Sequence, residues 1–173
     1  MGLDITAYSR LKHVGKHVEG WCTEEDADGD RAHIQAFAYD DFPQSFRGIP
    51  VLATRSVGSG ERFLDGGCYE ETVETQCHSF QAGSYTGYGM WRADLQEQFN
   101  PKRDPEQPFF ELIWFADNEG SIGPEAAADL LADFREHDAA YLAPEEIFNA
   151  RGKYLDWTRA CELAADGGLI RFQ

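Results

Sequence analysis

An almost wholly apolar run of seven residues, FFELIWF at 109–115, is the feature that most limits how this chain can fold. Its one charged residue is Glu111. A short apolar run bounded by turn residues is typical of a strand that is covered on both faces. We therefore expect residues 109–115 to form a central strand of a sheet.

Weaker strand signals flank this run. Residues 3–8 (LDITAY) alternate apolar and polar side chains, as a half-buried strand does. Residues 33–39 (HIQAFAY) and 169–173 (LIRFQ) also predict strands, and residues 62–80 predict a hairpin with Gly66 and Gly67 in one candidate turn. Residues 40–60 contain two prolines and several glycines, which predicts a long loop.

Apolar side chains at helical spacing predict three helices. One begins near Tyr88 and ends at Asn100, one begins at Pro124, and one covers about residues 153–165 and stops at Asp-Gly-Gly. The side chains expected on their buried faces are Tyr88, Trp91, Leu95 and Phe99; Ala127, Leu130, Leu131, Phe134 and Tyr141; and Tyr154, Trp157, Cys161 and Ala164.

The order of these elements predicts an α+β fold, with about three helices packed on a mostly antiparallel sheet. The 173 residues are one domain's worth, so residues 1–173 are expected to form a single compact domain. The N-terminus lacks the pattern of a signal peptide, and no stretch has the roughly 18 apolar residues of a membrane helix. We expect a soluble, cytoplasmic protein without a membrane partner.

The formal charge of −16 is concentrated in residues 104–146, which hold twelve acidic residues and one arginine. An acidic surface repels polyanions, so direct nucleic-acid binding is not expected. Glu125, Asp129, Asp133 and Glu136 form an outward row on the predicted second helix. This row is either a solvated face or an acidic surface that binds a basic partner, for example by imitating DNA.

Metal and cofactor motifs are not found. In the acidic run at 24–30 (EEDADGD), a calcium-loop alignment puts Arg31 where glycine is needed and Phe37 where the bidentate glutamate is needed. The four cysteines form no C-x-x-C pair, which favours free thiols. The sequence predicts neither a metal site nor a cofactor.

Catalytic motifs are also not found, and Glu111 is the main candidate for chemistry. A carboxylate in an apolar segment needs a partner or a raised pKa, and Arg92, Tyr85 and Tyr88 are candidate partners. Glu111 is therefore either a structural hydrogen-bonding group or a functional carboxylate. Asp117 and Glu119 lie in the loop that follows, which is either a turn or part of a site.

The glycine-aromatic segment GSYTGYGMW at 83–91 begins the predicted first helix. Ser84 and Thr86 are candidates to cap that helix, and Gly89 permits close approach of another backbone or a ligand. The ligand-binding residues predicted here are Tyr85, Thr86, Tyr88, Trp91, Arg92 and Glu111.

Four segments carry a family resemblance: MGLDITAYS at the start, AGSYTGYGMWRADL at 82–95, PFFELIWFADNEGSIGP at 108–124 and YLDWTRACELAADGGLIRF at 154–172. Together they resemble a family of small proteins of tailed bacteriophages and prophages. That family more often has Cys where Asn118 stands and Asn where Gly89 stands, so a thiol chemistry at 118 is not available to this chain. The resemblance implies a phage accessory protein that acts in the cytoplasm of the infected bacterium.

These features favour a non-enzymatic binding protein for a small host metabolite or signal, or for a host protein. One alternative is a hydrolase or transferase that uses Glu111 with Asp117 or Glu119 as acid and base. Another is an acidic inhibitor that binds proteins or mimics DNA. The oligomeric state is left open.

Overall fold

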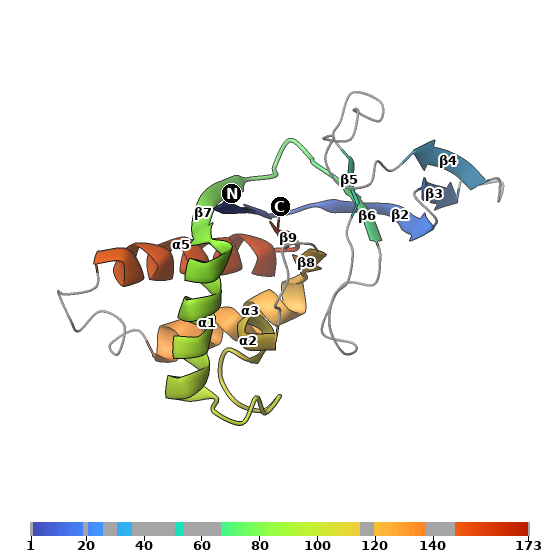
Figure 1. The fold of residues 1–173 in the computed structure, drawn as a ribbon. Coiled ribbons are helices and arrows are strands. Elements are labelled where there is room, and N and C mark those ends of the chain that lie inside the picture. The colour runs from blue at the N-terminus through green and yellow to red at the C-terminus, as the bar shows by residue number, and fades with distance from the viewer. Residues whose placement is uncertain are drawn as a thin grey trace.

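A computed structural model of the protein describes residues 2–18, 21–25, 31–35, 51–53, 67–114, 120–137 and 148–172. Its central element is an antiparallel sheet of four strands in the order β7-β1-β9-β8 (Figure 1). These strands are β1 (Gly2–Tyr8), β7 (Cys77–Ser84), β8 (Gly120–Ile122) and β9 (Leu169–Phe172). The helices are α1 (Tyr85–Phe99), α2 (Phe110–Trp114), α3 (Pro124–Glu136) and α5 (Phe148–Ala165). The predicted α+β class is confirmed.

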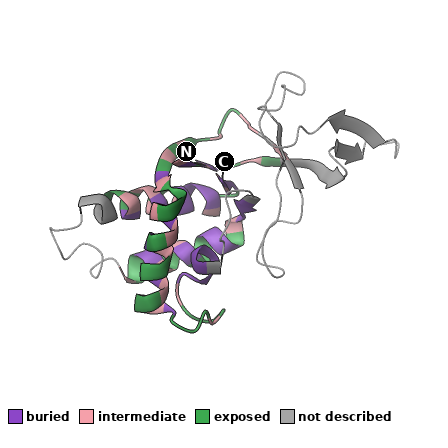
Figure 2. Ribbon diagram, in the orientation of Figure 1, coloured by how far each residue is buried: buried purple, intermediate pink, exposed green. Residues whose placement is uncertain are grey.

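The helices lie on one side of this sheet, and β1 shows why (Figures 1 and 2). Leu3, Ile5 and Ala7 are fully buried, while the alternate residue Asp4 is exposed. Because successive side chains of a strand point to opposite faces, the apolar set faces the helices. The alternation predicted for residues 3–8 is therefore confirmed, and β9 confirms the closing strand.

A second, five-stranded sheet has the order β4-β3-β2-β6-β5. Its strands are β2 (Lys12–Val18), β3 (Trp21–Glu25), β4 (Arg31–Gln35), β5 (Val51–Ala53) and β6 (Gly67–Glu70). Strands β6 and β7 both fall in the segment predicted to be a hairpin, but β6 pairs with β2 and β5 whereas β7 pairs with β1. β4 confirms part of the strand expected at 33–39. β5 interrupts the loop expected at 40–60, and the other residues of that loop lie outside the described part.

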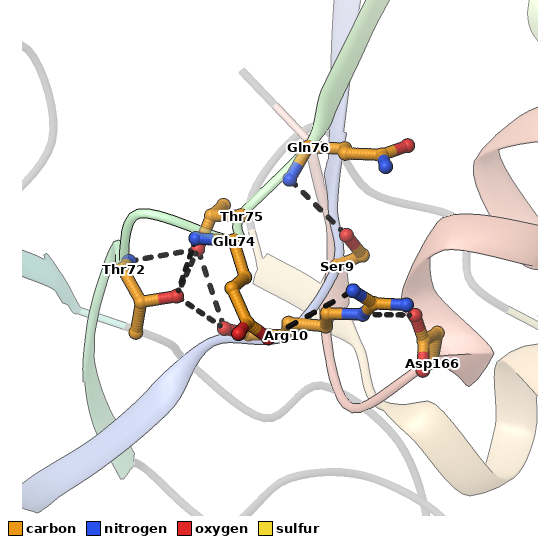
Figure 3. A network of polar contacts seen from close by, with 7 residues as sticks. All are labelled: Ser9, Arg10, Thr72, Glu74, Thr75, Gln76 and Asp166. Atoms are coloured by element: carbon orange, nitrogen blue, oxygen red, sulfur yellow. Dashed lines mark hydrogen bonds and ion pairs between the residues drawn. The ribbon is translucent and has the colours of Figure 1, made fainter.

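Two crossings join the sheets, and polar contacts hold them together (Figure 3). β1 continues into β2 through Ser9, Arg10 and Leu11, and residues 71–76 lead from β6 to β7. Ser9 donates its backbone N–H to the Gln76 carbonyl at 2.9 Å, and its hydroxyl accepts from the Gln76 N–H at 3.1 Å. The Arg10 guanidinium donates to the Asp166 carboxylate at 2.8 Å, which ties the crossing to the end of α5.

The helix predictions at 88–99, 124 onwards and 153–165 are confirmed by α1, α3 and α5. Their buried side chains are as expected where the structure describes them, with Leu131 and Phe99 only partly buried. Tyr141 lies outside the described residues. α1 ends at Asn100, whose backbone N–H bonds to the Gln96 carbonyl at 3.0 Å.

The strand predicted at 109–115 is wrong, because residues 110–114 form the short helix α2. Phe109, Leu112 and Ile113 are all at most 1% exposed, and α2 contacts both α1 and α3. A helix that is enclosed by other helices is apolar on every face, so its sequence has the same continuous apolar run as a central strand. Phe109, with φ of 58°, turns the chain sharply just before this helix.

Asp133 also differs from its prediction as part of an outward acidic row. Its carboxylate is partly buried and accepts the Phe109 backbone N–H at 2.7 Å, whereas Glu125, Asp129 and Glu136 are exposed. Asp133 thereby fixes the start of α2 against α3. Burial raises the pKa of Asp133 above its ordinary value of 3.8, and the bond from Phe109 opposes that shift in part.

This raised pKa predicts a pH dependence of stability. Since folded Asp133 binds its proton more tightly than unfolded Asp133, its contribution to the unfolding free energy grows as the pH falls from the folded pKa towards 3.8. Asp133→Asn is expected to remove that contribution and to keep an acceptor for Phe109. Asp133→Ala is expected to cost about 1–3 kcal/mol at neutral pH, because the Phe109 N–H loses its acceptor. Urea unfolding across this pH range compares the three proteins, and an unchanged pH profile for Asp133→Asn would contradict the assignment.

Candidate functional site

The glycine-aromatic segment at 83–91 leads from β7 into α1. Ser84 caps α1, because its hydroxyl accepts the Gly87 backbone N–H at 3.0 Å. Gly83 has φ of 114°, a conformation that favours glycine at the end of β7. Tyr85 is 42% exposed and Thr86 is exposed, so both predicted ligand residues lie on the surface of the first helical turn.

Tyr88 and Trp91 turn inward and meet Trp157 of α5. The ring centroids are 6.0 Å apart for Tyr88 and Trp91, 6.1 Å for Tyr88 and Trp157, and 5.6 Å for Trp91 and Trp157. The two indoles are nearly parallel, with an angle of 12° between their planes. Phe80 packs edge-on against Trp157, and Phe172 lies 5.8 Å from it. We call Tyr88, Trp91 and Trp157 the aromatic triad.

The polar atoms of the aromatic triad are the unusual feature of this core. Tyr88 Oη, Trp91 Nε1 and Trp157 Nε1 are shielded from solvent and have no hydrogen-bond partner among the described residues. The three side chains are 3%, 8% and 0% exposed. Buried donors are nearly always bonded in folded proteins, and each unbonded one costs about 1–3 kcal/mol. The triad thus contains three buried donors without a partner within one cluster of packed aromatic rings.

Arg92 has a different role from the one predicted. Its guanidinium donates from Nε to the Leu112 carbonyl at 2.8 Å and from Nη2 to the Ile113 carbonyl at 2.6 Å. These carbonyls belong to the last turn of α2 as the structure describes it, and the last carbonyls of a helix take partners from outside its own hydrogen-bond ladder. Arg92 therefore caps α2. The sequence makes Arg92 a candidate partner of Glu111, but these two hydrogen bonds go to backbone carbonyls instead. The guanidinium also lies 5.5 Å from the ring centroid of Tyr88, and its burial lowers the pKa of Arg92.

We expect Arg92→Ala to lower the unfolding free energy by about 3 kcal/mol or more, because it removes two hydrogen bonds from a charged donor, each worth about 1.5–3 kcal/mol. Arg92→Lys should recover only part of this loss, since an ammonium cannot match the fork of two bonds. The matched control is Arg103→Ala. Arg103 makes one exposed bond to Gln96 at 2.8 Å, so its loss should change stability by less than about 0.5 kcal/mol. Equal losses for Arg92→Ala and Arg103→Ala in urea unfolding would contradict the capping role.

Glu111 is 1% exposed and lies in the first turn of α2. Its predicted burial is confirmed, although in a helix rather than in a strand. The other two candidate catalytic residues, Asp117 and Glu119, lie outside the described residues, as does Asn118. Glu111 also acts on a neighbour: burial is the main cause of the raised pKa of the Cys161 thiol, and the charges of Asp133 and Glu111 add to it.

Of the six predicted ligand residues, the structure brings Tyr88, Trp91 and Arg92 together and leaves Tyr85 and Thr86 at the surface. Trp157 is a site residue that the sequence does not predict, although its spacing predicts that it lies on the buried face of the last helix. Helical spacing gives the face of one helix but not the side chain that it meets on another. A Cβ at Gly89 would meet no atom within 4 Å, so no described backbone makes the close approach proposed there.

Other kinds of site have less support. Within the described ranges, no group of three His, Cys, Asp or Glu side chains is arranged to hold a metal ion. Likewise, no described helix has both the length and the apolar character needed to cross a membrane. A nucleophile pair of Cys77 and His78 is not supported either. His78 bonds to Asp156 at 3.2 Å, whereas the neighbouring Cys77 is exposed and points to the other face of β7.

Comparison with protein-family models, curated proteins and solved structures finds no match for this chain.

Proposed function

We propose that the protein is a non-enzymatic binding protein that takes up a small host metabolite or signal molecule at the aromatic triad. In keeping with the sequence resemblance, we place it in the cytoplasm of a phage-infected bacterium. The observation that carries this proposal is the set of three buried, unbonded donors of Tyr88, Trp91 and Trp157. A ligand that brings hydrogen-bond acceptors would satisfy them.

The chemistry of the triad selects the ligand class. All three groups can donate a hydrogen bond, and none carries a charge at neutral pH, since burial raises the pKa of Tyr88. Flat aromatic faces favour flat partners. The ligand that fits is therefore a neutral or delocalised planar molecule with carbonyl or ring-nitrogen acceptors. Trp91 is the most exposed member of the triad at 8%, and we propose that the ligand enters from its side.

A binding screen tests this proposal. Nucleobases, nucleosides, nucleotides, cyclic nucleotides and amino acids are tested by thermal shift, and each hit is confirmed by calorimetry. A ligand at one hundred times its Kd stabilises the protein by about 2.7 kcal/mol, which raises the Tm by about 5–10 °C for a chain of this size. If no compound in these classes raises the Tm, small-molecule binding at the triad is contradicted.

Two phenylalanine substitutions separate binding from folding. Tyr88→Phe keeps the ring and removes an unbonded hydroxyl, so the free protein should lose little or no stability. Tyr154→Phe is the matched control, because the Tyr154 hydroxyl already donates to the Phe134 carbonyl. The control should lose about 1 kcal/mol of stability with unchanged ligand affinity. Tyr88→Phe should instead weaken ligand binding about tenfold, and equal affinities for the two variants would contradict the site.

The enzyme alternative has weaker support, because it requires Glu111 to reach a substrate while its side chain is 1% exposed. The alternative of an acidic surface that binds a basic partner also has weaker support. Asp133, one of the four residues of the predicted acidic row, accepts the Phe109 N–H within the fold. Neither is proposed here as the function.

A further inference from the structure

β7 is an edge strand, and it is the longer of the two edges of the four-stranded sheet. It has eight residues, whereas β8 at the opposite edge has three. One side of β7 pairs with β1 from Cys77 to Ser84, with a bulge at Ala82. No strand among the described residues pairs with its other side, so that side presents backbone N–H and C=O groups that can accept a further strand.

The sequence of β7 lacks the charged side chains and the proline that commonly protect an edge strand, although the strand has one bulge, at Ala82. Edge strands are commonly guarded by lysines, other charged side chains or proline. The segment CHSFQAGS contains no Asp, Glu, Lys, Arg or Pro, although charged residues make up 27% of the chain. A long edge strand without charged residues or proline is typical of a strand that pairs with another chain.

Helix α5 runs beside β7 and adds an exposed apolar side chain. Asp156 bonds to His78 at 3.2 Å, and Arg159 bonds to Gln76 at 3.2 Å, so this face of α5 is next to β7 and to the residue that precedes it. Leu155 lies one residue before Asp156 and four before Arg159, and it is 54% exposed. Figures 1 and 2 show β7 and α5 with exposed and partly exposed residues at this side of the molecule.

We propose that a second copy of the chain pairs with β7 in an antiparallel manner, with Leu155 of each copy at the border of the interface. The two four-stranded sheets then form one continuous sheet of eight strands about a two-fold axis. A strand that pairs with its own copy satisfies the exposed groups of both edges at once, as a closed, symmetric dimer requires.

Charge favours a second copy as the occupant. A chain with a formal charge of −16 repels its own copy over most of its surface. The charged side chains next to β7 are Asp4, which lies opposite Gln81, and Lys153, Asp156 and Arg159. Two are acidic and two are basic, so two acidic chains meet less repulsion at this edge than over the rest of their surface. The proposal is independent of small-molecule binding at the aromatic triad.

Sedimentation velocity and light scattering of the full chain over a wide concentration range test the proposal. We expect a reversible dimer with twice the chain mass of 19.5 kDa. Gln81→Lys places a charge on the exposed face of β7, and Leu155→Glu places one beside it. Each is expected to raise the dimer dissociation constant about tenfold or more. The matched control for Leu155→Glu is Met90→Glu, which adds the same negative charge at a 65% exposed apolar residue on α1 and should leave the constant unchanged.

Amide hydrogen exchange locates the interface without any substitution. Backbone amides within residues 77–84 should exchange more slowly at dimer-forming concentrations than after dilution, while those of α3 should not change. A chain that stays monomeric at every concentration overturns the proposal. A dimer that Gln81→Lys and Leu155→Glu do not weaken also overturns the proposal. A dimer whose formation does not slow amide exchange in β7 overturns it as well.

Discussion

Gly168→Ala is expected to lower the unfolding free energy by about 3 kcal/mol or more, since overpacking a rigid site costs about 1–3 kcal/mol and this site cannot relax by moving a side chain. A Cβ at residue 168 would lie 1.7 Å from the Tyr8 carbonyl oxygen and 2.8 Å from the Ser9 Cα. Both are backbone atoms at the crossing between the two sheets. The substitution must therefore push apart the end of β1 and the turn after α5.

Gly152→Ala is the matched control for this prediction. Gly152 lies within α5, and a Cβ there would meet no atom within 4 Å. Replacing a helical glycine with alanine should stabilise the protein by about 0.5–1 kcal/mol. Urea unfolding of the two variants should thus give changes of opposite sign. If Gly168→Ala were as stable as the unmodified protein, the close packing of β1 against the turn would be contradicted.

Trp157→Ala is expected to cost about 3–5 kcal/mol, the range found when a large buried aromatic side chain is removed. Trp157 is 0% exposed and contacts the rings of Phe80, Tyr88, Trp91 and Phe172. It thereby joins α1, α5 and the sheet. Its removal leaves a cavity at the point where these three elements meet, and the neighbouring side chains can fill only part of it.

Two further variants show whether the loss of stability in Trp157→Ala comes from the buried position and the aromatic ring of Trp157. Leu155→Ala, two residues away in the same helix, removes a 54% exposed side chain and should cost less than about 1 kcal/mol. Trp157→Phe keeps an aromatic ring, removes the unbonded indole N–H and should lose much less stability than Trp157→Ala. Chemical denaturation measures all three changes. A loss for Trp157→Ala as small as that for Leu155→Ala would mean that the triad does not hold the core together.

The sequence predicts the long elements of this fold well because their patterns are strong. Leu3, Ile5 and Ala7 mark one face of a strand, and Tyr88, Trp91 and Leu95 mark one face of a helix, so burial follows directly from the period of the chain. Ser84 precedes α1 and caps it as predicted. Such local signals need no knowledge of the rest of the molecule.

The apolar run at 109–115 is a segment in which local sequence signals do not distinguish a strand from a helix. A central strand and a short helix enclosed by other helices both require apolar residues at every position, and five residues are too few to show a period. What decides in favour of a helix is tertiary: Arg92 caps the end of α2, and Asp133 holds the Phe109 N–H at its start. These partners are distant in the sequence, and no spacing predicts them.

The sequence predicts only part of the candidate site, because spacing along the chain does not show which distant side chains meet. The sequence selects Tyr88, Trp91 and Arg92 as neighbours because they belong to one helix. It does not predict that Trp157, more than sixty residues later, stacks on Trp91 at 5.6 Å. The buried, unbonded donors also become visible only when all three side chains are in place, because bonding depends on everything that surrounds an atom.

The most direct test of the proposed function is a high-resolution crystal structure of the full chain purified from bacterial cells without added ligand. We expect electron density for a planar non-protein molecule within hydrogen-bonding distance of Tyr88 Oη, Trp91 Nε1 and Trp157 Nε1. A structure in which these three atoms bond only to protein groups or to isolated waters, with no other density beside the triad, would contradict it.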